Sequence, residues 1–193
     1  MITVPEIRTE LKDNEWPDRG TTHDRMIARA IVVDGAGNYY FMRAVRDDDF
    51  GRATLIETSG GGMEEGEAPE EAILRELKEE LGAEAEIICK IGVVSDRYNL
   101  ICRHNINNYF LCRALSFGEK HLNEDEINDF HLSTLKLDFE GAVNEYRLRA
   151  CTPLGRLIAN RELPVLMRAK EIITETGILG KENENGNENG IKH

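Results

Sequence analysis

The stretch that decides the fold runs from Gly61 to Ala83 and reads GGMEEGEAPEEAILRELKEELGA. Its first part is rich in glycine, and a helical pattern follows without interruption. Pro69 suits the first turn of a helix, where its missing N–H is not needed, and Gly82 suits the position after the last turn. The sequence therefore predicts a flexible glycine turn followed by a helix over residues 69–81.

The predicted helix separates apolar from acidic side chains, because each residue advances by about 100°. One apolar stripe is expected to pack on a sheet: Leu74, Leu77 and Leu81, with Ile73 at its margin. The acidic residues fall together on a different face: Glu76, Glu79 and Glu80. Clustered like charges repel unless a cation neutralises them, so this face is a candidate for divalent metal ligands. A solvated acidic helix face is the alternative.

Arg75 lies four residues after Glu71 and four before Glu79. Side chains at this spacing are neighbours on a helix, so Arg75 is expected to bridge the two carboxylates. Such a bridge holds the helix face in one geometry, and we predict an orienting role for Arg75.

Residues 61–83 resemble the Nudix box, G-x5-E-x7-R-E-U-x-E-E-x-G-U, in which U is an aliphatic residue. The required positions are filled, with the small Ala83 as the final U, by Gly61, Glu67, Arg75, Glu76, Leu77, Glu79, Glu80 and Gly82. On these residues the chain is identified as a member of the Nudix hydrolase family. The resemblance implies an α/β fold, a Nudix-type α/β/α sandwich with a mixed sheet and flanking helices, over about residues 25–176.

The resemblance also implies hydrolysis of a pyrophosphate linkage by water, with Mg²⁺ or Mn²⁺ as cofactor. In the family the metal ligands are box glutamates and the main-chain carbonyl just before the box glycine. The matching positions here are Gly60, Glu76, Glu79 and Glu80. The catalytic base of relatives is a box glutamate, here Glu79, or an acidic residue of a later loop. Residues 123–129 are such a loop, with Glu124 and Glu126 as its candidates, and a solvated acidic loop is the alternative.

Four side chains outside the box are candidates for substrate binding. Arg43, Arg46 and Arg52 precede the box, where a sheet edge or loop could face the phosphates, and arginine forks match phosphate oxygens. Tyr98 resembles a tyrosine downstream of the box in dinucleoside polyphosphate hydrolases, which implies adenine stacking. Surface arginines and a bend around Tyr98 are the alternatives.

Nucleotide sugars, dinucleoside polyphosphates and nucleoside triphosphates all remain open as substrates. ADP-ribose is disfavoured, because its hydrolases carry a proline after the box and this chain has none between Pro69 and Pro153. A non-catalytic Nudix-fold sensor or regulator of nucleotide metabolites is the alternative function, although such proteins often lose box glutamates that are present here. Isopentenyl diphosphate isomerisation, a third reading, needs a catalytic cysteine and a further glutamate that the sequence does not place.

Composition indicates one soluble globular domain. The chain has 193 residues, of which 40% are hydrophobic and 31% charged. The net charge of −12 argues against binding of polymeric nucleic acid, and a small nucleotide-linked molecule is the expected partner, with a homodimer left open. No long apolar run or N-terminal leader appears, so we expect no membrane association and a cytoplasmic location. The four cysteines lack metal-binding spacing and are expected to be reduced thiols.

Beyond the box, the sequence predicts alternating strands and helices. The expected strands are 27–33, 39–45, 85–94 and 107–115, with a bend at 103–105, and the expected helices are 137–149 and 154–174. Residues 1–24 form an N-terminal extension that could cover the domain, extend the sheet or reach a second subunit. Residues 177–193 are predicted to be a disordered polar tail.

Overall fold

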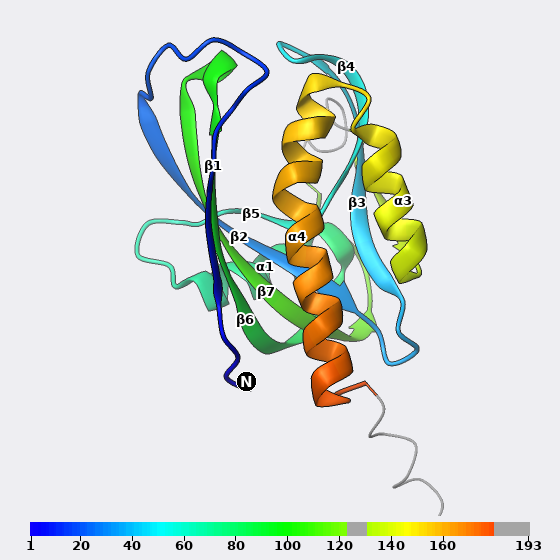
Figure 1. The fold of residues 1–193 in the computed structure, drawn as a ribbon. Helices are drawn as coiled ribbons and strands as arrows, with labels where there is room; N and C mark the ends of the chain where they lie inside the picture. The colour runs from blue at the N-terminus through cyan, green and yellow to red at the C-terminus, as the bar shows by residue number, and fades with distance from the viewer. Residues whose placement is uncertain (123–130, 180–193) are drawn as a thin grey trace, which may run out of the picture.

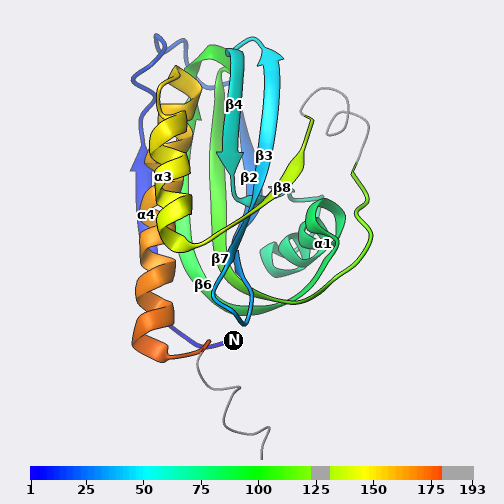
Figure 2. The same ribbon diagram turned by 90° about the vertical axis from the view of Figure 1, so that its right-hand side faces the viewer.

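The computed structural model describes residues 1–122 and 131–179. Its strands are β1 (Ile7–Leu11), β2 (His23–Val33), β3 (Tyr39–Asp48), β4 (Gly51–Glu57), β5 (Ser59–Gly62), β6 (Ala83–Tyr98), β7 (Arg103–Phe117) and β8 (Ser133–Leu137). Its helices are α1 (Pro69–Leu81), the 3₁₀ turn η1 (Asn99–Ile101), α3 (Phe139–Arg149) and α4 (Pro153–Thr176). Figure 1 shows α3 and α4 together in front of the sheet, and Figure 2 shows α1 on the opposite side. The expected α/β/α sandwich is therefore confirmed.

The sheet is mixed and has β2 at its centre. Its main order is β1-β6-β7-β2-β3-β4, with β5 paired to β2 and β8 paired to β3. β2 runs parallel to β7 along its whole length, while its other edge pairs first with β5 and then with β3, both antiparallel. The glycine run that the sequence predicts as a turn is thus partly a strand, because the main chain of β2 offers it hydrogen bonds.

Two apolar cores lie on the two faces of the sheet. The larger core packs α3 and α4 against the sheet and includes Phe41, Tyr109, Tyr146 and Leu166. The smaller core packs α1 against the other face and includes Ile73, Leu77 and Phe110. Burial of α1 on one face therefore holds the box helix at a set distance from β2 and β5.

The helix α1 has the predicted bounds, but the predicted apolar stripe is wrong at one position. Ile73 is fully buried, whereas Leu74 is 40% exposed. The face toward the sheet consists of pairs repeated every four residues: Ala72 and Ile73, Glu76 and Leu77, Glu80 and Leu81. Glu76 and Glu80 consequently lie within the packed face rather than on a separate one.

The connection between β6 and β7 lies earlier than the predicted bend at 103–105. Both strands are longer than expected, and the chain turns through η1 and through Cys102, whose φ is +52°. Asn99 holds this turn: its N–H donates to Asp13 Oδ2 at 2.7 Å and its Nδ2 donates to the Trp16 carbonyl at 2.8 Å. A contact with the N-terminal segment therefore places the turn.

The N-terminal residues extend the sheet. β1 pairs in parallel with β6, and the ring centroids of Trp16 and Phe50 are 5.3 Å apart in an edge-to-face arrangement. The predicted tail at 177–193 falls largely outside the described residues. All four cysteines are free thiols. Within the described parts of the chain, no helix is both long enough and apolar enough to cross a membrane.

Candidate active site

The glycine strand and the box helix are in close contact. The carboxylates of Glu76 and Glu80 face β5, and each residue is only 8% exposed. The Gly60 N–H donates a hydrogen bond to Glu80 Oε2 at 2.9 Å. A Cβ at Gly61 would lie 2.5 Å from Glu76 Oε1, so the approach of this carboxylate to the main chain requires glycine.

Arg75 holds the acidic residues around it; of its two predicted partners Glu79 is one, and Glu67 and Glu76 are partners that the sequence did not predict. Its Nε and Nη2 donate to the two oxygens of Glu67, both at 2.9 Å, and its Nη1 donates to Glu76 Oε1 at 2.7 Å. Glu79 Oε2 lies 3.5 Å from Nη1. Glu71, the other predicted partner, instead accepts a hydrogen bond from the Ala68 N–H at the start of the helix. An orienting role is thus supported, through Glu67 rather than Glu71.

The pairing of Arg75 with Glu67 shifts the pKa of both side chains. The hydrogen bond from Arg75, together with that from the Glu64 N–H, lowers the pKa of Glu67 from 4.5 to about 2. The same bond raises the pKa of Arg75 above its ordinary value. Both groups are therefore charged at neutral pH and hold the loop between β5 and α1 against the helix.

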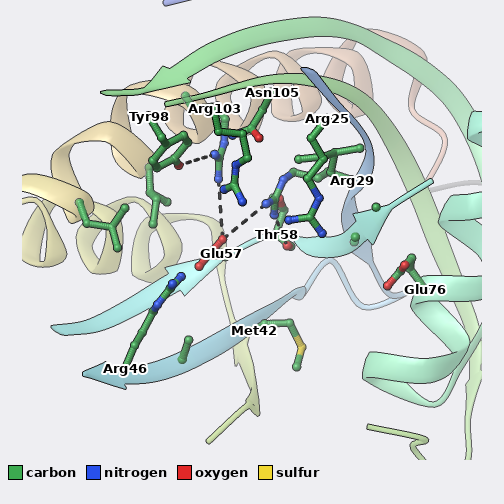
Figure 3. Close-up of a pocket in the computed structure, with 18 of the residues that line it drawn as sticks. Arg25, Arg29, Met42, Arg46, Glu57, Thr58, Glu76, Tyr98, Arg103 and Asn105 are labelled. Atoms are coloured by element: carbon green, nitrogen blue, oxygen red, sulfur yellow. Dashed lines mark hydrogen bonds and ion pairs between the residues drawn. The ribbon is translucent and has the colours of Figure 1, made fainter. Parts of the chain in front are cut away.

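A cavity of about 370 Å³ lies beside the box, within the size range of small-molecule sites. Figure 3 shows Glu76 at one side and an array of arginines along the other. Its charged lining consists of Arg25, Arg29, Arg46, Arg103, Arg161, Glu57, Glu76 and Glu80. Although the net charge of the chain is −12, five arginines line this one cavity. Such a concentration of guanidinium groups suits an anionic ligand.

Two of these arginines are held by acidic partners. Arg161 is 1% exposed and donates to Asp96 Oδ2 at 3.0 Å and to Glu162 Oε1 at 2.9 Å. Arg29 Nη2 lies 3.6 Å from Glu57 Oε2, and Arg29 Nη1 donates to the Thr58 carbonyl at 3.1 Å. These contacts set the positions of both guanidinium groups on the cavity wall.

Glu162, on α4, is the buried acceptor at the base of this arrangement. Its carboxylate accepts hydrogen bonds from the Thr58 N–H at 2.8 Å, the Thr58 hydroxyl at 2.9 Å and the Tyr146 hydroxyl at 2.6 Å. Burial raises the pKa of Glu162, but Arg161 and Arg29 lower it more, so the group is held ionised. Thr58 is adjacent to β5, and Glu162 therefore ties α4 to the strand that carries the box glycines.

The structure brings one of the three predicted substrate arginines to the cavity. Arg46 lines it, with Nε donating to Asp48 Oδ2 at 2.7 Å. Arg43 is half-buried and does not line the cavity, because it follows Met42 on β3 and successive side chains of a strand point to opposite faces. Arg52 is exposed at the start of β4, also outside the cavity. Neither Arg43 nor Arg52 is therefore placed to contact a ligand bound there.

Tyr98 lines the cavity but offers no open ring face. It is 4% exposed, the Arg103 guanidinium lies over its ring at 5.4 Å from the centroid, and Phe50 meets it edge to face. Its hydroxyl accepts a hydrogen bond from Arg161 at 2.8 Å. Adenine stacking on Tyr98 would require Arg103 to move, so the geometry favours a packing role.

The predicted metal ligands are only partly convergent. Glu76 and Glu80 meet at β5, whereas Glu79 has a side chain 45% exposed and directed toward Arg75. Throughout residues 1–122 and 131–179 no three His, Cys, Asp or Glu side chains are grouped as metal ligands would be. The acidic segment 123–129, with Glu124 and the predicted base Glu126, lies outside the described residues.

Sequence reasoning missed most of the cavity's charged residues: Arg25, Arg29, Arg103, Arg161 and Glu57. Arg25 and Arg29 share one face of β2, which their even spacing in the sequence indicates once that segment is read as a strand. No comparable signal marks Arg103 or Arg161, because only the pairing of β2 with β7 and the packing of α4 bring them to the same cavity.

The family model of the NUDIX domain matches residues 24–146. No curated protein sequence matches the chain. Among solved structures, a Nudix hydrolase from Nitrosomonas europaea is similar with a TM-score of 0.57 and 15% identity, over 80% of this chain and 90% of that one. The E. coli ORF135 protein is similar with a TM-score of 0.53 and 19% identity, over 79% and 92%.

A third structure, a UDP-X diphosphatase, has a TM-score of 0.51 and 17% identity, over 79% of this chain and 65% of that one. At these identities the structural likenesses support the fold, while the family model covers the box and most of the sheet. The complete box on β5 and α1, the sandwich around it and the match over residues 24–146 agree, and the chain belongs to the Nudix hydrolase family.

Proposed function

We propose that this protein hydrolyses a pyrophosphate linkage in a nucleotide or a nucleoside diphosphate-linked metabolite, with Mg²⁺ or Mn²⁺ as cofactor. One observation carries the proposal: two buried box carboxylates and an array of arginines line the same cavity. Carboxylates hold divalent cations and arginines hold phosphate oxygens, so the cavity offers both halves of a metal–pyrophosphate site.

The residues present fit a hard divalent cation. Glu76 and Glu80 offer oxygen ligands beside a glycine main chain that leaves room for them, and we assign the Gly60 carbonyl and Glu79 to the same site. Mg²⁺ prefers oxygen ligands and keeps several waters, so this partial set is suitable. When bound, the cation neutralises phosphate charge and lowers the pKa of a bound water.

The chain's own residues have separate roles in this proposal. Arg75 keeps Glu76 and Glu67 in position through the bonds described above. Glu79, the most exposed of the three glutamates, accepts the proton of the attacking water, and Glu126 is the alternative base. Arg29 and Arg46 on the cavity wall hold phosphate oxygens. We place this activity in the cytoplasm, and a homodimer remains a prediction.

The test is the Glu80→Gln variant, assayed by product release from nucleotide sugars, dinucleoside polyphosphates and nucleoside triphosphates with Mg²⁺, with Mn²⁺ or with EDTA. Glutamine keeps an acceptor for the Gly60 N–H, so the fold should persist. We expect activity to fall by at least the roughly 10–100-fold that loss of an outer metal-site partner costs. Glu84→Gln, at an exposed position just beyond α1, is the matched control.

Two outcomes would count against the proposal. Near-normal turnover by Glu80→Gln would remove Glu80 from the metal site. A wild-type protein that cleaves nothing, yet is stabilised against heat by a nucleotide, would instead be a Nudix-fold sensor.

A further inference from the structure

One end of the cavity is formed by two arginines and an asparagine on neighbouring strands. Arg25 lies on β2 and is paired in register with Asn105 on β7, and Arg103 precedes Asn105 by two residues. Residues two apart on a strand share a face, so all three side chains line the same wall. Figure 3 shows the three labels grouped together on the side away from Met42 and Arg46.

These three side chains lack the polar partners that Arg29 and Arg161 have. Within the described part of the chain, neither Arg25 nor Arg103 makes a hydrogen bond or an ion pair, and the Arg103 guanidinium lies over the ring of Tyr98. The Nε of Arg103 is buried without a hydrogen-bond partner. Asn105 is 1% exposed, and its Oδ1 is likewise buried and unpartnered. The cavity wall thus contains a buried donor, Arg103 Nε, and a buried acceptor, Asn105 Oδ1, that have no hydrogen-bond partner.

The protein alone pays a free-energy cost for this arrangement. Arg25 is exposed to solvent within the cavity wall. Partial desolvation and the nearby cation Arg29 lower its pKa, and the carboxylates of Glu76 and Glu57 offset only part of that shift. Burial and the proximity of Arg25 lower the pKa of Arg103 in the same way. Buried polar atoms such as Arg103 Nε and Asn105 Oδ1 are usually hydrogen-bonded, so leaving both unpartnered is costly. A bound anion would supply an acceptor for Arg103 Nε and negative charge between Arg25 and Arg103.

The unpartnered group is continuous with the box. Arg25 Nη2 lies 3.2 Å from the position that a Cβ at Gly62 would occupy, and Glu76 approaches the preceding residue, Gly61. An anion held by Arg25 would therefore sit beside the pyrophosphate bound at Glu76 and Glu80. Two guanidinium groups match the charge of about −1.5 to −2 on a terminal phosphate, whereas a carboxylate would leave one cation unpaired.

We propose that Arg25, Arg103 and Asn105 bind a phosphate group of the substrate that is additional to the two phosphates of the cleaved linkage. This inference rests on the proposed function and narrows its substrate class to pyrophosphates that carry a further phosphate. That phosphate is either the next one in a linear chain or a phosphomonoester on an attached sugar. The Asn105 amide offers a donor to phosphate and an acceptor for a neighbouring hydroxyl.

The experiment compares substrates that differ by one phosphate. Nucleoside triphosphate against diphosphate tests the linear source, and NADPH against NADH tests the phosphomonoester source. We expect the wild type to prefer the phosphate-rich member of one pair by roughly tenfold or more in kcat/KM. Arg25→Gln and Arg103→Gln should each reduce that preference by roughly tenfold, mainly through KM. Arg147→Gln, on the exposed face of α3, is the matched control and should leave it unchanged.

Thermal unfolding gives a second readout that does not need turnover. Inorganic tripolyphosphate should raise the Tm of the wild type more than pyrophosphate does at equal concentration, and Arg25→Gln should remove the difference. Without ligand, the Tm of Arg25→Gln should stay close to that of the wild type, because Arg25 makes no hydrogen bond or ion pair within the described residues that the substitution would remove. A lower Tm without ligand would show a structural role for Arg25 and overturn the inference.

The outcomes separate this inference from the proposed function. Equal cleavage of both members of every pair, with variants that slow both members alike, leaves the hydrolase standing and overturns the extra phosphate site. Absence of cleavage of every substrate overturns the hydrolase, and the tripolyphosphate measurement then decides the anion site alone.

Discussion

Glu162 shows how one buried carboxylate supports a cavity that it does not line. It is fully buried, and its oxygens accept from Thr58, Tyr109, Tyr146 and Arg161. We expect Glu162→Gln to lower the free energy of unfolding by about 3–5 kcal/mol, because it leaves the buried Arg161 short of a counter-charge. Denaturant unfolding measures the change, and the exposed Glu171→Gln on the same helix should stay within about 0.5 kcal/mol. A loss below about 1 kcal/mol for Glu162→Gln would show that Asp96 alone neutralises Arg161.

The lowered pKa of Glu67 is expected to make the stability of the protein depend on pH. Its pKa in the folded protein is about 2, below the ordinary 4.5, so the folded state binds the proton less well than the unfolded chain. The stability that the Glu67–Arg75 pair contributes is therefore complete above about pH 4.5 and is lost as the pH falls toward 2. In Tm measurements, Glu67→Gln should lie below the wild type at pH 6, and the two curves should converge as the pH is lowered through this window. A gap that stays constant down to pH 2 would mean that the carboxylate of Glu67 is not held by Arg75.

At the scale of elements, the contact between β5 and α1 determines whether the box can form. Gly61→Ala places a methyl group against the Glu76 carboxylate, so either the helix or the side chain must shift. A displacement of about 1 Å in a catalytic group can cost roughly 100-fold in rate, and we expect a loss of that size in kcat/KM. Gly118→Ala is the matched control, since a Cβ there meets nothing closer than 3.8 Å. Activity of Gly61→Ala within twofold of the wild type would indicate that Glu76 is not needed in this position.

Across the whole molecule, the N-terminal segment connects distant parts of the fold. Its Glu15 accepts from Arg156 Nε on α4 at 2.8 Å, Asp13 holds Asn99, and Trp16 packs on Phe50 at the cavity. Deletion of residues 1–22 should lower stability by about 3 kcal/mol, or roughly 6–12 °C in Tm, since it exposes the apolar surface under β1 and Trp16.

Trp16→Ala should reproduce part of this loss, and Arg19→Ala, at an exposed position in the same segment, should not. Thermal unfolding of the three proteins provides the comparison. An unchanged Tm on deletion would mean that residues 24–146, the part matched by the family model, and the helices carry the stability alone.

Local patterns in the sequence predicted α1 to the residue, because Pro69 and Gly82 act within their own turns of helix. They failed at Leu74, because the direction of the buried face depends on what α1 packs against. They also misplaced the turn between β6 and β7, which Asn99 makes only in contact with Asp13 and Trp16. Of the predicted substrate arginines, Arg46 lines the cavity, whereas Arg43 does not for a related reason: it lies on the opposite face of β3.

The sequence by itself determined the acidic helix, which depends on local periodicity, and the family, which depends on residues within the single segment 61–83; the α/β/α class followed from the resemblance of that segment to the Nudix box. Only the tertiary structure decided which arginines meet the box. Arg25, Arg103 and Arg161 come from two strands and a helix far apart in the chain, and they share a cavity because β2 pairs with β7 and α4 packs over the sheet. The spacing of residues along the sequence does not predict which distant side chains come together, because that depends on strand pairing and helix packing between distant segments.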